Sequence, residues 1–333
     1  MSEAGQQPTI YDVAKSAGVA ASTVSRAFSR PGRVSARTAA HVHAVAAELG
    51  YRATPLTGRP PATRTSTVAL VVSDVTNPVY FGIVRALETA AAAAGYTVVV
   101  ASARESDEVE RAILDRTLPT VDGVVLAGSR LPDRTIRTLA EHHAFVVLNR
   151  LVPGVRSIVP DTRPGIGGAL AHLHGLGHRA VTYLAGPAGS WADGQRWRSI
   201  LDLAPGLDLK AGRVGPCAPT TEGGLRATEE ILRQGATAVL AYNDLLAIGL
   251  MTGLAEAGVR VPDQVSVVGF DNIFCADLCT PPLTTVAAPL WTMGTRAFAE
   301  LHLQIEGTAR RPRPVAPLPT RLVLRRSTVD VPA

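Results

Sequence analysis

Short runs of Val, Leu and Ala alternate with helical stretches through most of this 333-residue chain, and this alternation restricts its fold most. The runs after residue 66 are TVALVVS, TVVVA, VDGVVLAG, AFVVLNR, AVTYLAG, AVLAYND and VSVVGFD. The segments between them, such as 83–94, 108–118 and 134–142, carry apolar residues at helical spacing. Strands without a polar face indicate parallel sheets that helices cover on both sides. We therefore expect an α/β protein with two doubly wound lobes of parallel sheet.

The size of the two blocks of strands and helices predicts how the chain is divided. The predicted boundaries are 1–53 for a helical front domain, 54–66 for a Pro-rich hinge or linker, 67–161 plus about 290–318 for an N-lobe, and 162–289 plus about 319–333 for a C-lobe. Doubly wound sheets bind their ligands beyond the carboxyl ends of the strands. A ligand cleft is therefore expected between the two lobes.

The front of the chain has the pattern of three short helices joined by one tight turn. Thr9 can cap the first helix, with Asp12 at the capping-box position. Gly18 allows a sharp turn before a second helix at about residues 21–29, and Ser35 can cap a third. Two crossing helices with a Gly-containing turn form a helix-turn-helix domain, whose second helix can enter the major groove of DNA.

The charge of the chain is concentrated in the same segment. The net charge is +5, and residues 1–64 hold 8 basic and 3 acidic residues, whereas the remainder holds 25 of each. Excess positive charge on a small module is typical of proteins that bind a polyanion. A basic face that is merely solvated is the alternative on charge alone. Together with the helix pattern, the charge predicts double-stranded DNA as the partner.

The stretch IYDVAKSAGVAASTVSRAF, followed by RVSARTAAHVHAVAAELGYR, resembles the DNA-binding domain of the lactose repressor/galactose repressor (LacI/GalR) family. D-V-A-x-x-A-G-V followed by T-V-S-R is a specific signature of that domain. The resemblance implies that Ala21, Ser22 and Arg26 contact bases, and an Arg can bind guanine through two hydrogen bonds. One such domain covers little DNA, so a homodimer on a palindromic operator is expected. The residues that we expect at the DNA are Thr9, Tyr11, Ala21, Ser22, Thr23, Ser25, Arg26, Ser29 and Ser35.

The segment ATPLTGRPPATRTST occupies the place where family members usually have a hinge helix that wedges a Leu into the minor groove. Counted from the preceding Gly-Tyr, Pro60 stands at the Leu position, and the pair Pro60-Pro61 ends any helix. A one-turn helix capped by Thr54 would instead place Leu56 on the same face as Pro60. Leu56 and Pro60 are both candidate wedge residues, although an extended Pro-rich tether is the favoured interpretation.

Polar residues follow several predicted strands at their carboxyl ends. Carboxylates, amides and an Arg fork can each engage two neighbouring hydroxyls, and an aromatic ring can cover an apolar sugar face. Any one of them could be a simple cap or turn residue, but their recurrence at equivalent strand ends favours a binding site. The candidate effector residues at these ends are Asp74, Asn77, Tyr80, Asn149, Arg150, Asn243, Asp244 and Asp271.

The family resemblance extends over the rest of the chain through TNPVYFGIVRALE, LGHRAVTYLAGP and AVLAYNDLLAIGLMTGLAEAGVRVPDQVSVVGFDN. It implies a core like that of periplasmic sugar-binding proteins, a sugar-like effector, and Arg196 in GSWADGQRWRSIL as a further effector residue. Asn149 stands where Asp is usual, and Pro219 where an aromatic residue often stacks on the ligand. A nucleobase or nucleoside effector, or loss of the effector, therefore stays open as an alternative.

An enzyme is the competing interpretation from another class. The pair Gly165-x-Gly167 lacks the third glycine of a dinucleotide site. Among His172, His174 and His178, only the last two share a helix face, glycines interrupt that helix, and no other metal ligand is nearby. We therefore expect no catalytic residue, no cofactor and no metal. The polar N-terminus and the absence of a long uncharged apolar run predict a cytoplasmic protein without a membrane partner.

Overall fold

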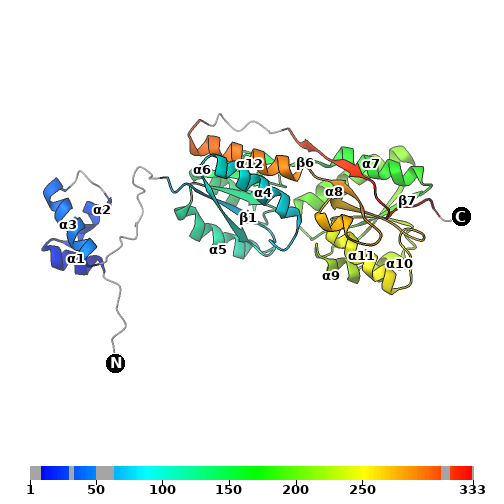
Figure 1. The fold of residues 1–333 in the computed structure, drawn as a ribbon, viewed down its shortest axis with the longest axis horizontal. Coiled ribbons are helices and arrows are strands. Elements are labelled where there is room, and N and C mark those ends of the chain that lie inside the picture. The colour runs from blue at the N-terminus through cyan, green and yellow to red at the C-terminus, as the bar shows by residue number, and fades with distance from the viewer. Residues whose placement is uncertain (1–8, 30–33, 50–63, 309–315, 332–333) are drawn as a thin grey trace, which may run out of the picture. The chain divides into compact units, whose positions relative to one another are not determined.

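The computed structural model describes residues 9–29, 34–49, 64–308 and 316–331 (Figure 1). The chain divides into two units, Met1–Arg64 and Thr65–Ala333. The first unit contains helices, and the second is an α/β unit with two large sheets and one small one. The candidate wedge residues Leu56 and Pro60 lie outside the described residues.

The first unit consists of α1 (Ile10–Ala17), α2 (Ala21–Ser29) and α3 (Ala36–Glu48), which pack around a small apolar core. Val13, Val24 and Val42 contribute one fully buried side chain from each helix. Each of these helices has apolar residues along one stripe only, so burial of the three stripes against one another determines their arrangement. The predicted three-helix domain is confirmed.

The helix ends of this unit are stabilised by neighbouring residues. The backbone N–H and the hydroxyl of Thr9 donate to the Asp12 carboxylate at 2.7 and 2.6 Å, and these hydrogen bonds lower the pKa of Asp12. Gly18 ends α1 at φ +65°, a left-handed conformation that favours glycine. Ser35 Oγ accepts the Thr38 N–H at 3.2 Å at the start of α3. The predicted caps and turn therefore form.

The N-lobe of the second unit is built on a parallel sheet in the order β2-β1-β3-β4-β5. Its strands are β1 (Thr67–Val72), β2 (Thr97–Ser102), β3 (Gly123–Ala127), β4 (Ala144–Leu148) and β5 (Ser157–Ile158). Its helices are α4 (Val79–Ala93), α5 (Asp107–Thr117), η1 (Leu118–Thr120), α6 (Asp133–His142) and α12 (Leu290–Ile305).

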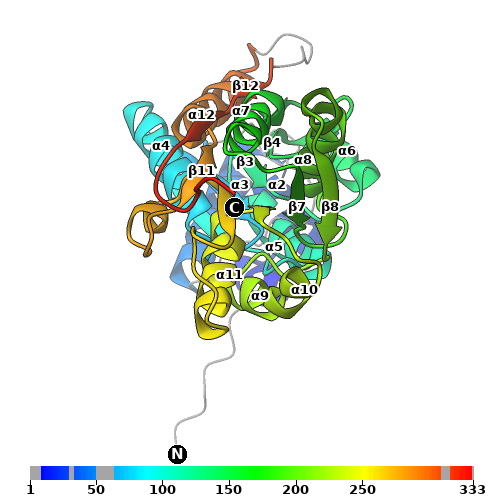
Figure 2. The ribbon, with the colours of Figure 1, turned by 90° about the vertical axis from the view of Figure 1, so that its right-hand side faces the viewer.

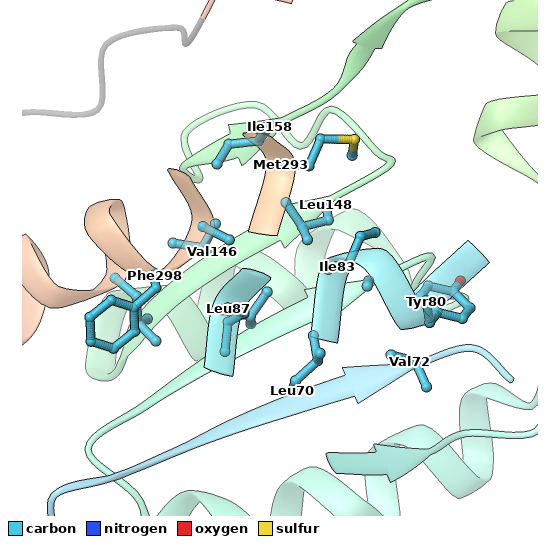
Figure 3. Packing of buried hydrophobic residues seen from close by; sticks show 14 of the residues in the cluster. Leu70, Val72, Tyr80, Ile83, Leu87, Val146, Leu148, Ile158, Met293 and Phe298 are labelled. Atoms are coloured by element: carbon cyan, nitrogen blue, oxygen red, sulfur yellow. The ribbon is translucent and has the colours of Figure 1, made fainter. Parts of the chain in front are cut away.

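Helices cover both faces of this sheet. Leu70 of β1 packs with Ile83 of α4 and Phe298 of α12 on one face (Figure 3). The next residue, Val71, packs with Ile136 of α6 and with α5 on the other face. Because successive strand residues point to opposite faces, a strand buried on both sides must be apolar throughout. This explains the runs of Val, Leu and Ala in the sequence.

The C-lobe is built on a sheet in the order β13-β11-β10-β9-β7-β8, in which β13 is antiparallel and the other pairs are parallel. Its strands are β7 (Ala180–Leu184), β8 (Lys210–Val214), β9 (Ala238–Ala241), β10 (Ser266–Asp271), β11 (Thr284–Ala287) and β13 (Arg321–Val323). Its helices are α7 (Thr162–Gly175), α8 (Trp191–Leu203), η2 (Ala204–Leu207), α9 (Thr221–Arg226), α10 (Thr228–Arg233), α11 (Asp244–Glu256) and η3 (Phe274–Asp277).

In this lobe α7 and α8 pack on one face of the sheet, and α10 and α11 pack on the other, with α9 against α11. The apolar runs in the sequence do not predict β8, β11 or β13. The stretch KAGRV of β8 is polar and lies at the sheet edge, so it lacks the apolar run of the inner strands. Two doubly wound lobes, as predicted from the sequence, are nevertheless present.

The chain passes between the lobes three times. It does so from β6 (Pro160–Asp161) to α7, from β11 to α12, and from β12 (Leu318–Pro319) to β13. The short strands β6 and β12 pair in parallel, and β12 lies beside α7 (Figure 2). Among the described residues, no helix is both long and apolar enough to span a membrane.

Candidate ligand cleft and helix-turn-helix surface

A polar cleft lies between the two lobes of the second unit, beyond the carboxyl ends of their strands. Its N-lobe wall consists of Ser73, Asn77, Val79, Tyr80, Glu105, Gly128, Ser129, Arg130, Asn149 and Arg150. Its C-lobe wall consists of Ser190, Trp191, Ala192, Arg196, Pro219, Tyr242, Asn243 and Asp271. This is the position at which doubly wound sheets bind ligands.

The structure brings most of the predicted effector residues together in this cleft. Those that line it are Asn77, Tyr80, Asn149, Arg150, Arg196, Asn243 and Asp271. Asp74 is not among the lining residues. Its Oδ1 accepts the backbone N–H and the hydroxyl of Thr76 at 2.9 and 2.8 Å, so its side chain closes the turn after β1.

Asp244 is the other predicted effector residue that does not line the cleft. It begins α11 and is fully buried in the C-lobe, where its carboxylate accepts the Thr285 hydroxyl at 2.5 Å and the Ile273 N–H at 2.8 Å. Burial, followed by the nearby Asp271 carboxyl, raises the pKa of Asp244 to about 8. Because the first turn of the helix directs it inward, Asp244 supports the loop after Asp271.

Arg196 forms the centre of the C-lobe wall. Its Nη2 donates to Asp271 Oδ1 at 3.0 Å, and its Nη1 donates to the Tyr242 carbonyl. The guanidinium carbon lies 3.7 Å from the ring centroid of Phe270 and 4.5 Å from that of Tyr242. Burial raises the pKa of Asp271 to about 6, and the Arg196 charge opposes this rise. The cleft thus contains a desolvated ion pair with its Arg fixed between two rings.

Asn243 both caps α11 and lines the cleft. Its Oδ1 accepts the Leu246 N–H at 2.9 Å, and its Nδ2 donates to the Pro219 carbonyl at 3.1 Å. The simpler interpretation of Asn243 as a helix cap is therefore correct, and the cap also ties the Pro219 loop to this wall. On the opposite wall the Tyr80 hydroxyl lies 2.8 Å from Ser73 Oγ, and burial raises the pKa of Tyr80.

Several lining residues were not predicted as effector contacts, and some had a signal in the sequence. Glu105 and Arg130 follow the carboxyl ends of β2 and β3, as Asn149 follows β4. The strand-end rule could therefore have identified both. Trp191 and Ser190 have no such signal, because they line the cleft through the first turn of α8 and the loop before it.

The histidines near residue 175 have structural partners. His178 is buried, with Nδ1 3.1 Å from the Thr237 hydroxyl and Nε2 3.1 Å from the Ser266 hydroxyl. His172 Nε2 lies 2.9 Å from the Thr328 hydroxyl. Within the described parts of the chain, no group of three or more His, Cys, Asp or Glu residues could hold a metal ion.

The helix-turn-helix unit exposes most of the residues expected at the DNA. Thr9, Tyr11, Ser22, Ser25, Arg26 and Ser35 are exposed, and Ala21 and Thr23 are partly buried. Ser29 is the last residue of α2. Val24 and Ala27 of the same helix point into the core of the unit. The buried and exposed faces of α2 are thus separated as a recognition helix requires.

Comparison with known proteins identifies both parts of the chain. Residues 9–53 match a family model described as bacterial regulatory proteins, lacI family, and residues 170–328 match a periplasmic binding protein-like domain. The chain is 30% identical over 307 residues to the HTH-type transcriptional repressor CytR of Escherichia coli (strain K12), which covers 90% of each chain. It is 31% identical over 334 residues to the HTH-type transcriptional regulator GalR of the same strain, covering 98% of this chain and 96% of GalR.

Solved structures give the same result. The lac repressor dimer bound to operator and the anti-inducer ONPF has a TM-score of 0.71 at 27% identity, covering 97% of this chain and 100% of that one. The transcriptional regulator CelR in complex with cellobiose has a TM-score of 0.72 at 29% identity, covering 96% and 99%.

A helix-turn-helix domain in one chain with a two-lobed core and a polar interlobe cleft defines a ligand-responsive transcription regulator. The chain belongs to the LacI family of bacterial regulatory proteins.

Proposed function

We propose that the protein is a homodimeric repressor that binds a palindromic operator and responds to a sugar-like effector in the interlobe cleft. The observation that carries this proposal is an exposed recognition helix with Ser22 and Arg26 in the same chain as a cleft suited to hydroxyls. On this proposal the front domain, 1–53, is the DNA-binding head of each protomer, and a linker connects it to the two lobes. The linker is 54–66, the N-lobe 67–161 plus about 290–318, and the C-lobe 162–289 plus about 319–333.

Arg26 is the residue from which we expect most of the sequence discrimination. It is exposed on α2 beside Ser22 and Ser25. Small side chains let the helix backbone approach the base edges, and an Arg can engage both acceptors of a guanine at once. The hydroxyls of Thr9 and Ser35, at the N-termini of α1 and α3, suit phosphate oxygens and would fix the position of the domain on DNA.

An exposed apolar surface on the α/β unit supports the dimer. Phe81 of α4 stacks on Phe274, with ring centroids 6.1 Å apart, yet their exposed fractions are 51% and 58%. Leu278, after η3, is 74% exposed, and Val99 and Val100 are exposed on the edge strand β2 beside α4. Exposed apolar side chains that lie together, as Phe81 and Phe274 do, are typical of protein interfaces. A two-fold pair of such surfaces would hold two DNA-binding heads over two half-sites.

The cleft would couple the effector to the DNA-binding heads. Arg196, Asn149 and Asp271 offer donors and acceptors, and Tyr80 and Trp191 offer rings for an apolar sugar face. A ligand that contacts both walls favours one arrangement of the lobes, and its unequal affinity for the two arrangements changes how the heads are spaced. On this proposal the effector binds and dissociates without chemical change, so the cleft needs no catalytic group. The protein acts on DNA in the cytoplasm.

The test is selection of genomic fragments by the purified full-length protein at near-physiological salt. Enrichment of a palindrome with half-sites about one helical turn apart would support dimeric operator recognition. Salt-sensitive binding without sequence preference would contradict it. Titration of a sugar panel, read through the fluorescence of Trp191 in the cleft, tests the effector.

Two variants separate base reading from general attraction. Arg26→Ala should weaken operator binding by about 1–3 kcal/mol and relax the preference at one base position. Lys15→Ala removes a positive charge from an exposed position of α1 and should weaken binding to all sequences alike. If both variants changed the preference for the operator over other sequences equally, Arg26 would have no special role in reading a base.

A further inference from the structure

Glu105 and Arg130 form a charged pair on the N-lobe wall of the cleft. Arg130 Nε donates to Glu105 Oε2 at 2.8 Å, and Arg130 Nη2 donates to the same oxygen. The Arg130 side chain is 17% exposed and the Glu105 side chain 29%, so the pair is largely removed from water. Both residues line the cleft that we propose as the effector site.

Glu105 has an unusual backbone conformation. Glu105 has φ +57° and the preceding Arg104 has φ +52°, in the left-handed region that non-glycine residues rarely adopt. Asn149 at φ +60° and Asp271 at φ +107° share this feature, and both line the same cleft. The Glu105 N–H donates to the Ser73 carbonyl at 2.8 Å and ties the turn to the end of β1. Strained conformations of this kind persist where the surrounding structure holds a functional side chain in place.

Arg130 is held in place from two sides. Its backbone N–H donates to the buried Glu110 carboxylate at 2.9 Å. Arg150 Nη1 donates to the carbonyls of Ser129 and Leu131, at 3.1 and 2.7 Å, so the residues on either side of Arg130 are also fixed. The pair is therefore a preorganised part of the wall, with a supporting layer behind it.

The charges of the cleft compensate one another. Three arginines line it, and their carboxylate partners are Glu105 for Arg130, Asp133 for Arg150 at 2.6 Å, and Asp271 for Arg196 at 3.0 Å. A phosphate or carboxylate on a ligand would have to compete with one of these carboxylates for its arginine. A displaced Glu105 or Asp271 carboxylate would then lie largely out of water without a counter-charge, which is strongly unfavourable.

We propose that Glu105 and Arg130 select an uncharged polyhydroxylated effector and exclude the phosphorylated or carboxylated form of the same molecule. Both Arg130 bonds go to Oε2 of Glu105, so Oε1 can accept a hydroxyl of the ligand. Glu105 also neutralises the positive charge of Arg130, so the cleft no longer attracts an anion. The negative charge of Glu105 is thus the element that acts against the wrong ligand. This inference rests on the proposed effector function of the cleft and defines the class of ligand.

The decisive variant is Glu105→Gln, which removes the negative charge and keeps the shape of the side chain. Orthophosphate is the first probe, and the pairs D-ribose with D-ribose 5-phosphate and D-glucose with D-glucose 6-phosphate are the second, all read by tryptophan fluorescence of the full chain. The wild-type protein should not respond to orthophosphate, whereas E105Q should bind it. For a sugar that binds, the preference of the wild type for the uncharged form should fall by about tenfold or more in E105Q.

Two further variants control the experiment. Glu222→Gln removes the same charge from an exposed pair with Arg226, 2.9 Å apart on α9, and should behave as the wild type. Glu105→Asp keeps the charge and should keep the exclusion of phosphate, which a purely structural role of the side chain would not predict.

Two results would overturn the proposal. One is a wild-type protein that binds orthophosphate or a phosphorylated sugar as tightly as the neutral sugar. The other is an E105Q variant that responds to phosphate no more than E222Q does. The phosphate titration requires neither DNA nor an identified sugar, so it stays interpretable if operator selection fails.

Discussion

Removing the Arg196 guanidinium tests what holds the C-lobe wall of the cleft together. Arg196→Met keeps an unbranched chain but removes the donor to Asp271, 3.0 Å away, and the donor to the Tyr242 carbonyl. It also removes the guanidinium from the face of Phe270. Asp271, only 5% exposed, is then left without its counter-charge.

The expected loss of stability is large at alkaline pH and smaller in mild acid. Removing one partner of a buried ion pair costs about 3–5 kcal/mol, because the remaining charge stays buried. Burial already raises the pKa of Asp271 to about 6 with Arg196 in place, and loss of Arg196 raises it further. A carboxyl whose folded pKa is raised contributes stability at low pH that is lost as the pH rises through that value. Protonation of Asp271 should therefore relieve part of the cost in acid.

Urea unfolding of the full chain, followed by circular dichroism at about pH 8 and about pH 5.5, measures this effect. Arg163→Met is the matched control, because its pair with Asp202, at 2.8 Å, has exposed fractions of 55% and 48%. Loss of that exposed pair should cost no more than about 1 kcal/mol. An Arg196→Met loss that is equally small near pH 8, or that grows on acidification, would refute the reasoning.

Four further substitutions test other parts of the structure by unfolding measurements on the full chain. Asp244→Asn should flatten the pH dependence of the urea midpoint, since the raised pKa of Asp244, about 8, makes the wild type lose stability as the pH rises towards that value. Gly249→Ala would place a Cβ 1.9 Å from the Thr221 carbonyl oxygen and should cost about 1–3 kcal/mol. Gly194→Ala in α8 meets open space and should instead stabilise by up to about 1 kcal/mol; equal effects of the two would contradict the packing argument. Ala20→Ser supplies a cap oxygen at the start of α2, where the Ala20 carbonyl accepts the Val24 N–H, and should stabilise the helical unit by about 1 kcal/mol in thermal unfolding.

The helices, turns and inner strands follow from interactions between residues close in the sequence. The Asp12 carboxylate reaches Thr9, the Ser35 hydroxyl reaches the Thr38 N–H, and Gly18 needs no partner to adopt its left-handed turn. The order of apolar strands and helices likewise predicts a doubly wound fold, because only buried parallel strands are apolar on both faces. Local sequence was sufficient for these features.

The position of the cleft could also be predicted, because the carboxyl ends of parallel strands meet at one edge of a sheet. Asn149, Arg150 and Asp271 lie in the cleft for this reason. The hinge candidates Leu56 and Pro60 stay predictions.

Only the tertiary structure decided which of several neighbouring polar residues faces the cleft. Asn243 lines it, whereas the adjacent Asp244 turns into the C-lobe core and bonds to Thr285, 41 residues further along the chain. Glu105 and Arg130 come from turns 25 residues apart, and their pairing depends on β2 and β3 flanking β1. The direction of a side chain at a strand end depends on one or two backbone dihedral angles. Those angles are set by packing against segments far away in the sequence, so the local pattern of residues does not determine them.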